Sequence, residues 1–146
     1  MSKSNTFENQ LLDLLFNNTD IPNIGDAAGI QNSAAAGSYY IVLHTADPGE
    51  AGNASTSEAT YTGYARVAVA RTAGGWTVAG ATVSNAAQIA FGECTAGSDI
   101  VTYCSITVAS SGASVILYSG ALTASRSISA GITPLFAIGA LTVTED

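Results

Sequence analysis

IVTYCSITVASSGASVILYSGALTASRSISAGITPLFAIGALTVT, residues 100–144, contains one charged side chain, that of Arg126. Short runs of alternating apolar and polar residues within it are separated by Gly, Ser and Pro, which is typical of consecutive short β-strands. The solvent faces of such strands usually carry charge, but here they carry mostly Ser, Thr, Ala and Gly. Small neutral side chains stay wettable without repelling a neighbour at close range. The segment therefore predicts strands whose surface is covered by another molecule, as in an assembly.

The composition of the whole chain supports the same fold class. Its 146 residues suffice for one domain with a single core. Charged residues make up 10% of the sequence, against about 25% in typical globular proteins. Ala, Gly, Ser and Thr fill the deficit, and the Gly, Thr and Val content disfavours helix. We predict an all-β protein, with an N-terminal helix and extended arm over residues 1–38 and a single β-sandwich or jelly-roll-like domain over residues 39–146.

An amphipathic helix is predicted over residues 5–17, with Asn5 and Glu8 in capping-box spacing. Its apolar residues recur at helical spacing: Phe7, Leu11, Leu14 and Leu15, widened by Leu12 and Phe16. So wide a stripe fits both packing on the chain's own sandwich and docking on a neighbouring subunit. The candidate interaction residues on this helix are Phe7, Leu11, Leu12, Leu15 and Phe16. Residues 18–38 are too long and polar for an ordinary connection, which predicts the extended arm.

The remaining sequence predicts short strands separated by turns. Asp47–Gly49 is a turn in which proline fixes φ and glycine takes the left-handed position. Gly74–Gly75 is a hairpin turn, and the polar pair Ser84–Asn85 is interpreted as a break between strands. The predicted strands are 39–45, 61–71, 76–78, 87–91, 100–108, 114–118, 121–128 and 134–143. Several short strands at this spacing favour a sandwich or jelly roll.

The charge distribution excludes some partners. The net charge is -7 and the chain has four basic residues, so neutralisation of nucleic-acid phosphates is not expected. Seven of the eleven acidic residues lie in the first 65 positions, opposed there only by Lys3. That acidic zone is either a solvated face or a surface for a basic partner. The apolar run 132–143 is too short for a membrane span of about 20 residues, so we expect no membrane partner.

No catalytic or metal-binding pattern is evident. His44 is the single histidine, no nucleophile elbow accompanies it, and its position favours a strand end that bonds the following turn. The paired carboxylates Asp47 with Glu50 and Glu145 with Asp146 lie in loop or terminal sequence, where burial is not expected. We predict that the protein is not an enzyme and binds no cofactor or metal.

Cys94 and Cys104 leave two alternatives open. A disulfide between them would close a small loop and contribute about 3 kcal/mol of stability. Two buried thiols are favoured instead, as expected of a protein made in the cytosol, where thiols stay reduced.

Two arginines are further candidate interaction residues. Arg66 and Arg71 are each expected to pair with a carboxylate such as Asp47 or Glu58, or with a neighbouring subunit. The aromatic residues form either a carbohydrate-binding face or, more commonly for strand residues, the sheet core. They are Trp76, Tyr39, Tyr40, Tyr61, Tyr64 and Tyr118.

Several strings resemble a group of small tailed-bacteriophage virion proteins that are labelled tail-fibre-like or cement proteins. They are YIVLHTADPG (40–49), YTGYARV (61–67), GWTV (75–78), SNAA (84–87), YSGALT (118–123) and GALTV (139–143). The start of the chain, residues 6–37, resembles that group as well, so the similarity spans most of the sequence. These strings contain no catalytic residues.

The resemblance implies a structural virion protein. Our first interpretation is a capsid cement or decoration protein on the capsid surface. It would oligomerise as a homotrimer or homodimer and clamp neighbouring copies of the major capsid protein to stabilise the head. Many weak contacts would then add up to avidity. The alternative is a tail or tail-fibre component that meets a host glycan.

Overall fold

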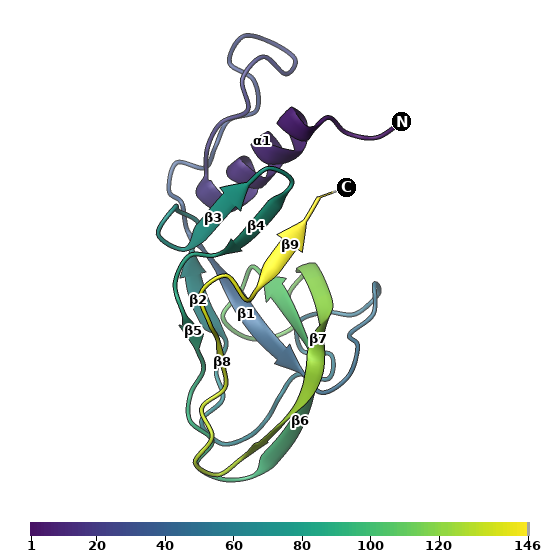
Figure 1. Ribbon diagram of the computed structural model, residues 1–146, viewed down its shortest axis with the longest axis vertical. Coiled ribbons are helices and arrows are strands. Elements are labelled where there is room, and N and C mark those ends of the chain that lie inside the picture. The colour runs from purple at the N-terminus through teal and green to yellow at the C-terminus, as the bar shows by residue number, and fades with distance from the viewer. Residues whose placement is uncertain (146) are drawn as a thin grey trace. The chain divides into compact units, whose positions relative to one another are not determined.

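The computed structural model describes residues 1–145. Asp146 lies outside the described residues; it is the last residue of the predicted domain and one of the predicted Glu145–Asp146 pair. Most of the regular structure is antiparallel sheet, with one helix near the N-terminus (Figure 1). The all-β fold class is therefore confirmed. The elements are α1 (Asn5–Asn17), β1 (Ser38–His44), β2 (Val67–Ala70), β3 (Trp76–Ala79), β4 (Thr82–Asn85), β5 (Ile89–Ala90), β6 (Ser98–Thr107), β7 (Ile116–Ser129), β8 (Leu135–Phe136) and β9 (Thr142–Thr144).

The chain forms two compact units rather than one strand domain after residue 38. Of the described residues, the first unit contains 1–38, 70–89 and 136–145, and the second contains Tyr39–Val69 and Ala90–Leu135. Residues 70–89 and 136–145, which the sequence prediction placed in the sandwich, thus belong to the same unit as the N-terminal helix. The reason is that β4 pairs with β9, close to the C-terminal end.

Helix α1 begins and ends where the sequence predicts, although its N-cap differs. The side chain of Ser4 accepts a hydrogen bond from the backbone N–H of Phe7, so Ser4 is the N-cap in place of the predicted Asn5. At the other end, Asn18 adopts the left-handed conformation with φ 54, as C-terminal cap residues commonly do. The first capping interaction lies one residue earlier than the predicted capping box.

The first unit packs α1 on a three-stranded sheet of order β3-β4-β9 (Figure 1). Leu12 and Phe16 are fully buried, and the Phe16 ring meets the edge of Trp76 at a centroid distance of 4.8 Å. Strand β4, which the sequence analysis missed, pairs with both β3 and β9. The side chain of Asn85 at its end donates to the carbonyl oxygens of Ala87 and Ala137, so a residue interpreted as a strand break is instead a buried link.

Residues 18–38 do not run as an extended arm. Ile21 and Ile30 form an antiparallel bridge with backbone hydrogen bonds of 2.9 and 2.8 Å in the two directions, so the segment doubles back on itself (Figure 1). Asn18 closes the base of this loop, because its side chain bonds both the N–H and the carbonyl of Ser33. The prediction of an extended arm is therefore wrong, since a local pairing satisfies the backbone.

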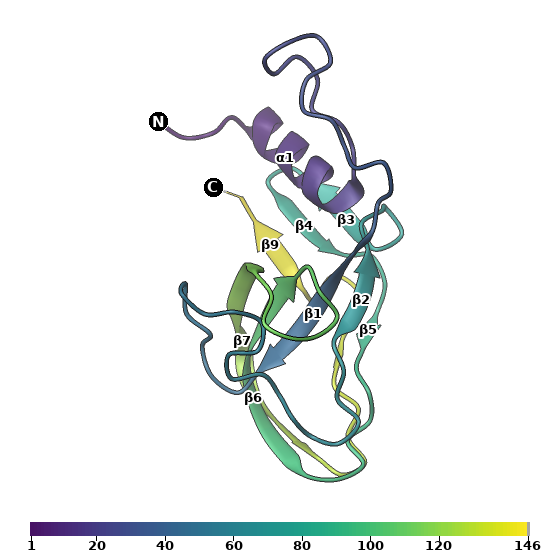
Figure 2. The same ribbon diagram turned by 180° about the vertical axis from the view of Figure 1, so that it is seen from behind.

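The second unit holds a four-stranded antiparallel sheet of order β2-β1-β6-β7 (Figure 2). β1 pairs with β6 from Tyr40 opposite Thr107 to His44 opposite Tyr103. β7 is one continuous strand of 14 residues, where the sequence analysis expected two strands with a break near Ser119. Strands β5 and β8 form a separate two-stranded sheet.

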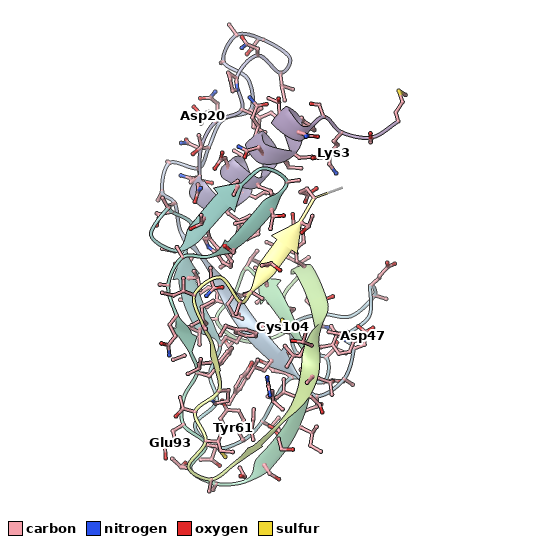
Figure 3. All side chains as sticks on the ribbon, in the orientation of Figure 1. Lys3, Asp20, Asp47, Tyr61, Glu93 and Cys104 are labelled. Atoms are coloured by element: carbon pink, nitrogen blue, oxygen red, sulfur yellow. The ribbon has the colours of Figure 1, made fainter. Side chains whose placement is uncertain are left out.

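The core of the second unit is apolar and aromatic. Its buried residues include Ile41, Val42, Leu43, Tyr61, Phe91, Val101, Ile106 and Ile128. The ring of Tyr64 meets Tyr61 edge-on at 5.4 Å and stacks on Phe91 at 6.1 Å. Figure 3 shows Tyr61 within this unit, whereas Asp47 lies on an outlying loop.

Candidate interaction surface

Strand β7 is the most exposed regular element of the second unit. Ten of its 14 residues are exposed, in a pattern without the alternation of a half-buried strand. Only Ile128 is buried, with 2% of its surface exposed. Most of the exposed side chains are Ser, Thr, Ala and Gly, and Arg126 is the single charged one. The strand therefore offers a neutral surface on both faces of the sheet.

Exposed apolar side chains adjoin this strand in the sequence. Val108 and Val115 flank the loop that leads into β7, and Leu117 lies near its start; 47%, 59% and 38% of their surfaces are exposed. On the paired strand, Ile100 is 60% exposed. Large apolar residues on a surface this poor in charge are typical of an interaction site.

Arg66 holds the loop before β7 in place. Its Nε and Nη2 donate to the two carboxylate oxygens of Glu58 at 2.7 Å each, and its Nη1 and Nη2 donate to the carbonyl oxygens of Ala109 and Gly112 at 3.0 and 2.8 Å. The Arg66 side chain is 1% exposed. Its predicted pairing with Glu58 is thus present within the chain, and so Arg66 stabilises the second unit from inside.

Glu58 is the centre of a wider, partly buried network. The hydroxyl of Tyr64 donates to Glu58 at 3.1 Å and accepts the backbone N–H of Leu43 at 3.2 Å. Burial raises the pKa of Tyr64, and the Glu58 hydrogen bond raises the pKa of Arg66 further above its usual value. Both groups keep the protonation state that these hydrogen bonds require.

Arg71 caps helix α1 within the first unit. Its Nε donates to the carbonyl oxygen of Leu15 at 2.6 Å, and its Nη2 donates to that of Leu14 at 2.8 Å. A further bond from Nη1 reaches the carbonyl oxygen of Ala36 at 3.1 Å. A cation at the C-terminus of a helix satisfies unpaired carbonyls and opposes the negative end of the dipole. Arg71 therefore ties the helix to the residues that follow the loop.

The candidate helix residues divide between two faces. Leu12 and Phe16 are fully buried against the sheet of the first unit, so they are core residues. Phe7, Leu11 and Leu15 are half-buried on another face. Of the two uses predicted for the stripe, packing within the chain accounts for Leu12 and Phe16.

His44 is a structural residue. It is fully buried, and its Nδ1 lies 2.8 Å from the carbonyl oxygen of Thr56 while its Nε2 lies 2.7 Å from the hydroxyl of Ser105. A carbonyl can only accept, so Nδ1 carries the proton and Nε2 accepts from the serine. Burial lowers the pKa of His44, which favours this neutral form.

Cys94 and Cys104 are buried free thiols, so the alternative of a disulfide between them is not formed. Burial raises the pKa of Cys104 to about 11.

The aromatic residues do not form a glycan-binding face centred on Trp76, because that side chain is 1% exposed in the core of the first unit. Among residues 1–145, no cluster of three His, Cys, Asp or Glu side chains is placed to hold a metal ion. Within the same range, no helix has the length and apolar character needed to cross a membrane.

Comparison with known protein families identifies the family of the chain. A family model described as Podophage GP4 fiber I protein gp80 matches residues 2–144. The chain belongs to this family. Membership in the fibre family confirms the resemblance to phage virion proteins and makes the chain a structural component of a virion. No curated protein matches the sequence.

Sequence reasoning anticipated some of these residue roles and missed others. The charge-poor segment contains β7, the most exposed strand of the second unit. The capping role of Arg71 was missed, since its carbonyl partners lie more than 30 residues away in the sequence. The internal role of Arg66 was half anticipated, because Glu58 was named among its carboxylates.

Proposed function

We propose that this chain is a non-enzymatic structural subunit of a phage tail fibre. The observation that carries this proposal is the match of nearly the whole chain, residues 2–144, to a family described as a fibre protein. The neutral, exposed strand β7 supports it, because assembly by many similar contacts needs a surface that neighbours can approach without charge repulsion.

The fibre alternative replaces capsid cement as our preferred interpretation. Both roles use the same neutral surface, so the surface alone does not favour either, but the family description names a fibre. The cement interpretation also relied on an extended arm over residues 18–38. The segment expected to strap a neighbouring capsid subunit is a loop folded back on itself, closed by the bridge between Ile21 and Ile30.

Host-glycan binding does not enter the proposal. The predicted glycan face depended on Trp76, which packs against Phe16 in the core of the first unit. Tyr61 is likewise buried, and its hydroxyl donates to the carbonyl oxygen of Gly92 at 3.1 Å. These rings are therefore committed to packing within the chain.

A phage that carries a nonsense mutation in the gene for this chain tests the proposal. Grown without a suppressor, its particles should lack part of a tail appendage in electron micrographs and adsorb poorly to host cells. Their heads should keep the heat resistance of wild-type heads. Complete fibres on particles whose heads release DNA at lower temperature would instead support the cement interpretation and refute ours.

A further inference from the structure

The four-stranded sheet of the second unit has two very different edges. Its strand order, β2-β1-β6-β7, places β2 at one edge and β7 at the other. β2 has four residues, whereas β7 has 14. An edge strand presents backbone N–H and C=O groups that have no partner in its own sheet, and a long one is a template for pairing with another strand.

Half of the β7 edge carries the usual protection against such pairing. One residue of β6 lies opposite residues 122–125 of β7, because the register changes from Val101 with Arg126 to Tyr103 with Ala121. A bulge of this kind bends the edge out of line, and a charged residue next to it opposes further pairing. The C-terminal half of β7, with the bulge and Arg126, is therefore protected.

The residues between this bulge and a second register change at Leu117 carry no charge that would oppose pairing. Ser119, Gly120 and Ala121 pair in regular register with Ser105, Cys104 and Tyr103 of β6. Residues 116–125 contain neither a charged residue nor a proline. Within this range, residues 118–121 keep a regular register, so this short part of the edge is neutral and able to continue the sheet.

The side chains at this edge leave room for a second strand. Ser119, Gly120 and Ala121 are all exposed, and a Cβ placed on Gly120 would meet nothing within 4 Å. Small residues on both faces allow the backbone of another chain to approach to the spacing of about 4.8 Å between strands. The leucines on either side, Leu117 and Leu122, are exposed and half-buried respectively, and would cover the ends of a short ladder.

The charge of the chain indicates which partner fits. A basic partner would be drawn to the acidic zone of the first 65 residues, where seven carboxylates are opposed by Lys3, and not to a neutral strand. Two copies of a chain with a net charge of -7 repel each other over most of their surfaces. They approach with least repulsion where charge is scarcest, which is residues 100–144 with Arg126 alone.

We propose that the β7 edge around residues 119–121 pairs antiparallel with the same edge of a second copy of this chain. A twofold axis at this point makes the contact self-complementary, as isologous interfaces require. Small Ser, Gly and Ala side chains then lie opposite one another, and the two sheets join into one continuous sheet. The pairing does not depend on where in the virion the chain is located.

Sedimentation velocity of the full-length protein at increasing micromolar concentrations tests the pairing. The wild-type protein should shift from monomer to dimer. Ser119→Lys should raise the dimer dissociation constant on the order of tenfold or more, because the twofold axis places like charges close together. Ser110→Lys adds the same charge at an exposed position of the loop before β7 and should leave the constant unchanged. A wild-type protein that stays monomeric, or equal dissociation constants for the two lysine variants, would overturn the proposal.

Cross-linking gives a second readout that does not depend on disrupting the strand. In an antiparallel pair, facing Cα atoms lie about 4.5–5.5 Å apart, which suits a disulfide. Under mild oxidation, at least one of the variants Ser119→Cys, Gly120→Cys and Ala121→Cys should form a covalent dimer. Ser110→Cys should stay monomeric, and the native thiols of Cys94 and Cys104 should not interfere because they are buried. No covalent dimer from any of the three β7 variants, or equal cross-linking of the loop control, would contradict pairing at this edge.

Discussion

Replacing Arg66 by Met removes the guanidinium that joins three segments of the second unit. Its hydrogen bonds reach Glu58 and Ser55 on one loop and the carbonyl oxygens of Ala109 and Gly112 on the loop before β7. The substitution keeps most of the apolar stem and leaves Glu58, 19% exposed, with the hydroxyl of Tyr64 as its remaining donor among the contacts described above.

The size of the effect follows from burial. The Arg66 side chain is 1% exposed and that of Glu58 is 19% exposed. Removing one member of a fully buried ion pair costs about 3–5 kcal/mol, so the loss here should be about 2–4 kcal/mol, because solvent reaches part of the remaining carboxylate. An exposed pair would cost less than about 1 kcal/mol. Native domains are stable by about 5–15 kcal/mol, so Arg66→Met should remove a large part of the free energy of unfolding. The melting temperature should fall by on the order of 10 °C.

Urea unfolding followed by far-ultraviolet circular dichroism measures this loss. The double variant Glu58→Gln with Arg66→Met serves as a control, because it leaves no partly buried carboxylate without its cation. It should be more stable than Arg66→Met alone by roughly 1–3 kcal/mol. A loss below about 1 kcal/mol for Arg66→Met would show that the pair behaves as a solvent-exposed one, which would refute our account of how the loop before β7 is held.

Three further predictions concern other buried groups. Burial lowers the pKa of His44 below its ordinary value of 6.5. Below pH 6.5 the unfolded chain therefore binds more protons than the folded chain, and the free energy of unfolding should fall as pH falls. His44→Gln should lessen this dependence in urea titrations at several pH values, and an unchanged dependence would contradict the assignment. Leu12→Ala should lower the free energy of unfolding by about 3 kcal/mol, because Leu12 is fully buried. The same change at half-buried Leu11 should lower it by less than about 1 kcal/mol. Equal losses in chemical denaturation would contradict the division of the helix into a buried and a half-buried face. Both cysteines are free, so a thiol-specific reagent should count two thiols per unfolded, unreduced chain; a count of zero would show a disulfide.

The local elements were predicted well because their determinants are close in the sequence. Helix α1 begins and ends at the predicted residues, since the spacing of its apolar residues and the asparagines at its end act within a few turns. Strand β1 was predicted to within one residue, because Tyr39 to Leu43 form an uninterrupted apolar run that ends at a turn with Pro48.

Elements that depend on distant partners were missed. Strand β4 is short and partly polar, and it exists because β3 pairs on one side and β9, almost 60 residues later, pairs on the other. In the same way, Ser119 and Gly120 suggest a break, but pairing with Ser105 and Cys104 holds them in one strand. Propensity is weak evidence where tertiary pairing decides.

The scarcity of charge around β7 was predictable, but its place in the sheet was not. The scarcity of charge in residues 100–144 was visible in the sequence and predicted a covered surface. It did not show that β7 is an edge strand, because the strand order of a sheet is set by tertiary structure. The bonds from Arg66 to the loop before β7 and from Arg71 to the end of α1 were also hidden, since the carbonyl groups that they reach lie far away in the sequence.

The position of this chain in the virion tests the central claim most directly. Purified phage particles can be labelled with a gold-conjugated antibody raised against the chain and viewed by electron microscopy. Our account predicts label along the tail fibres and unlabelled heads. Label spread over the head surface would contradict the assignment to the fibre.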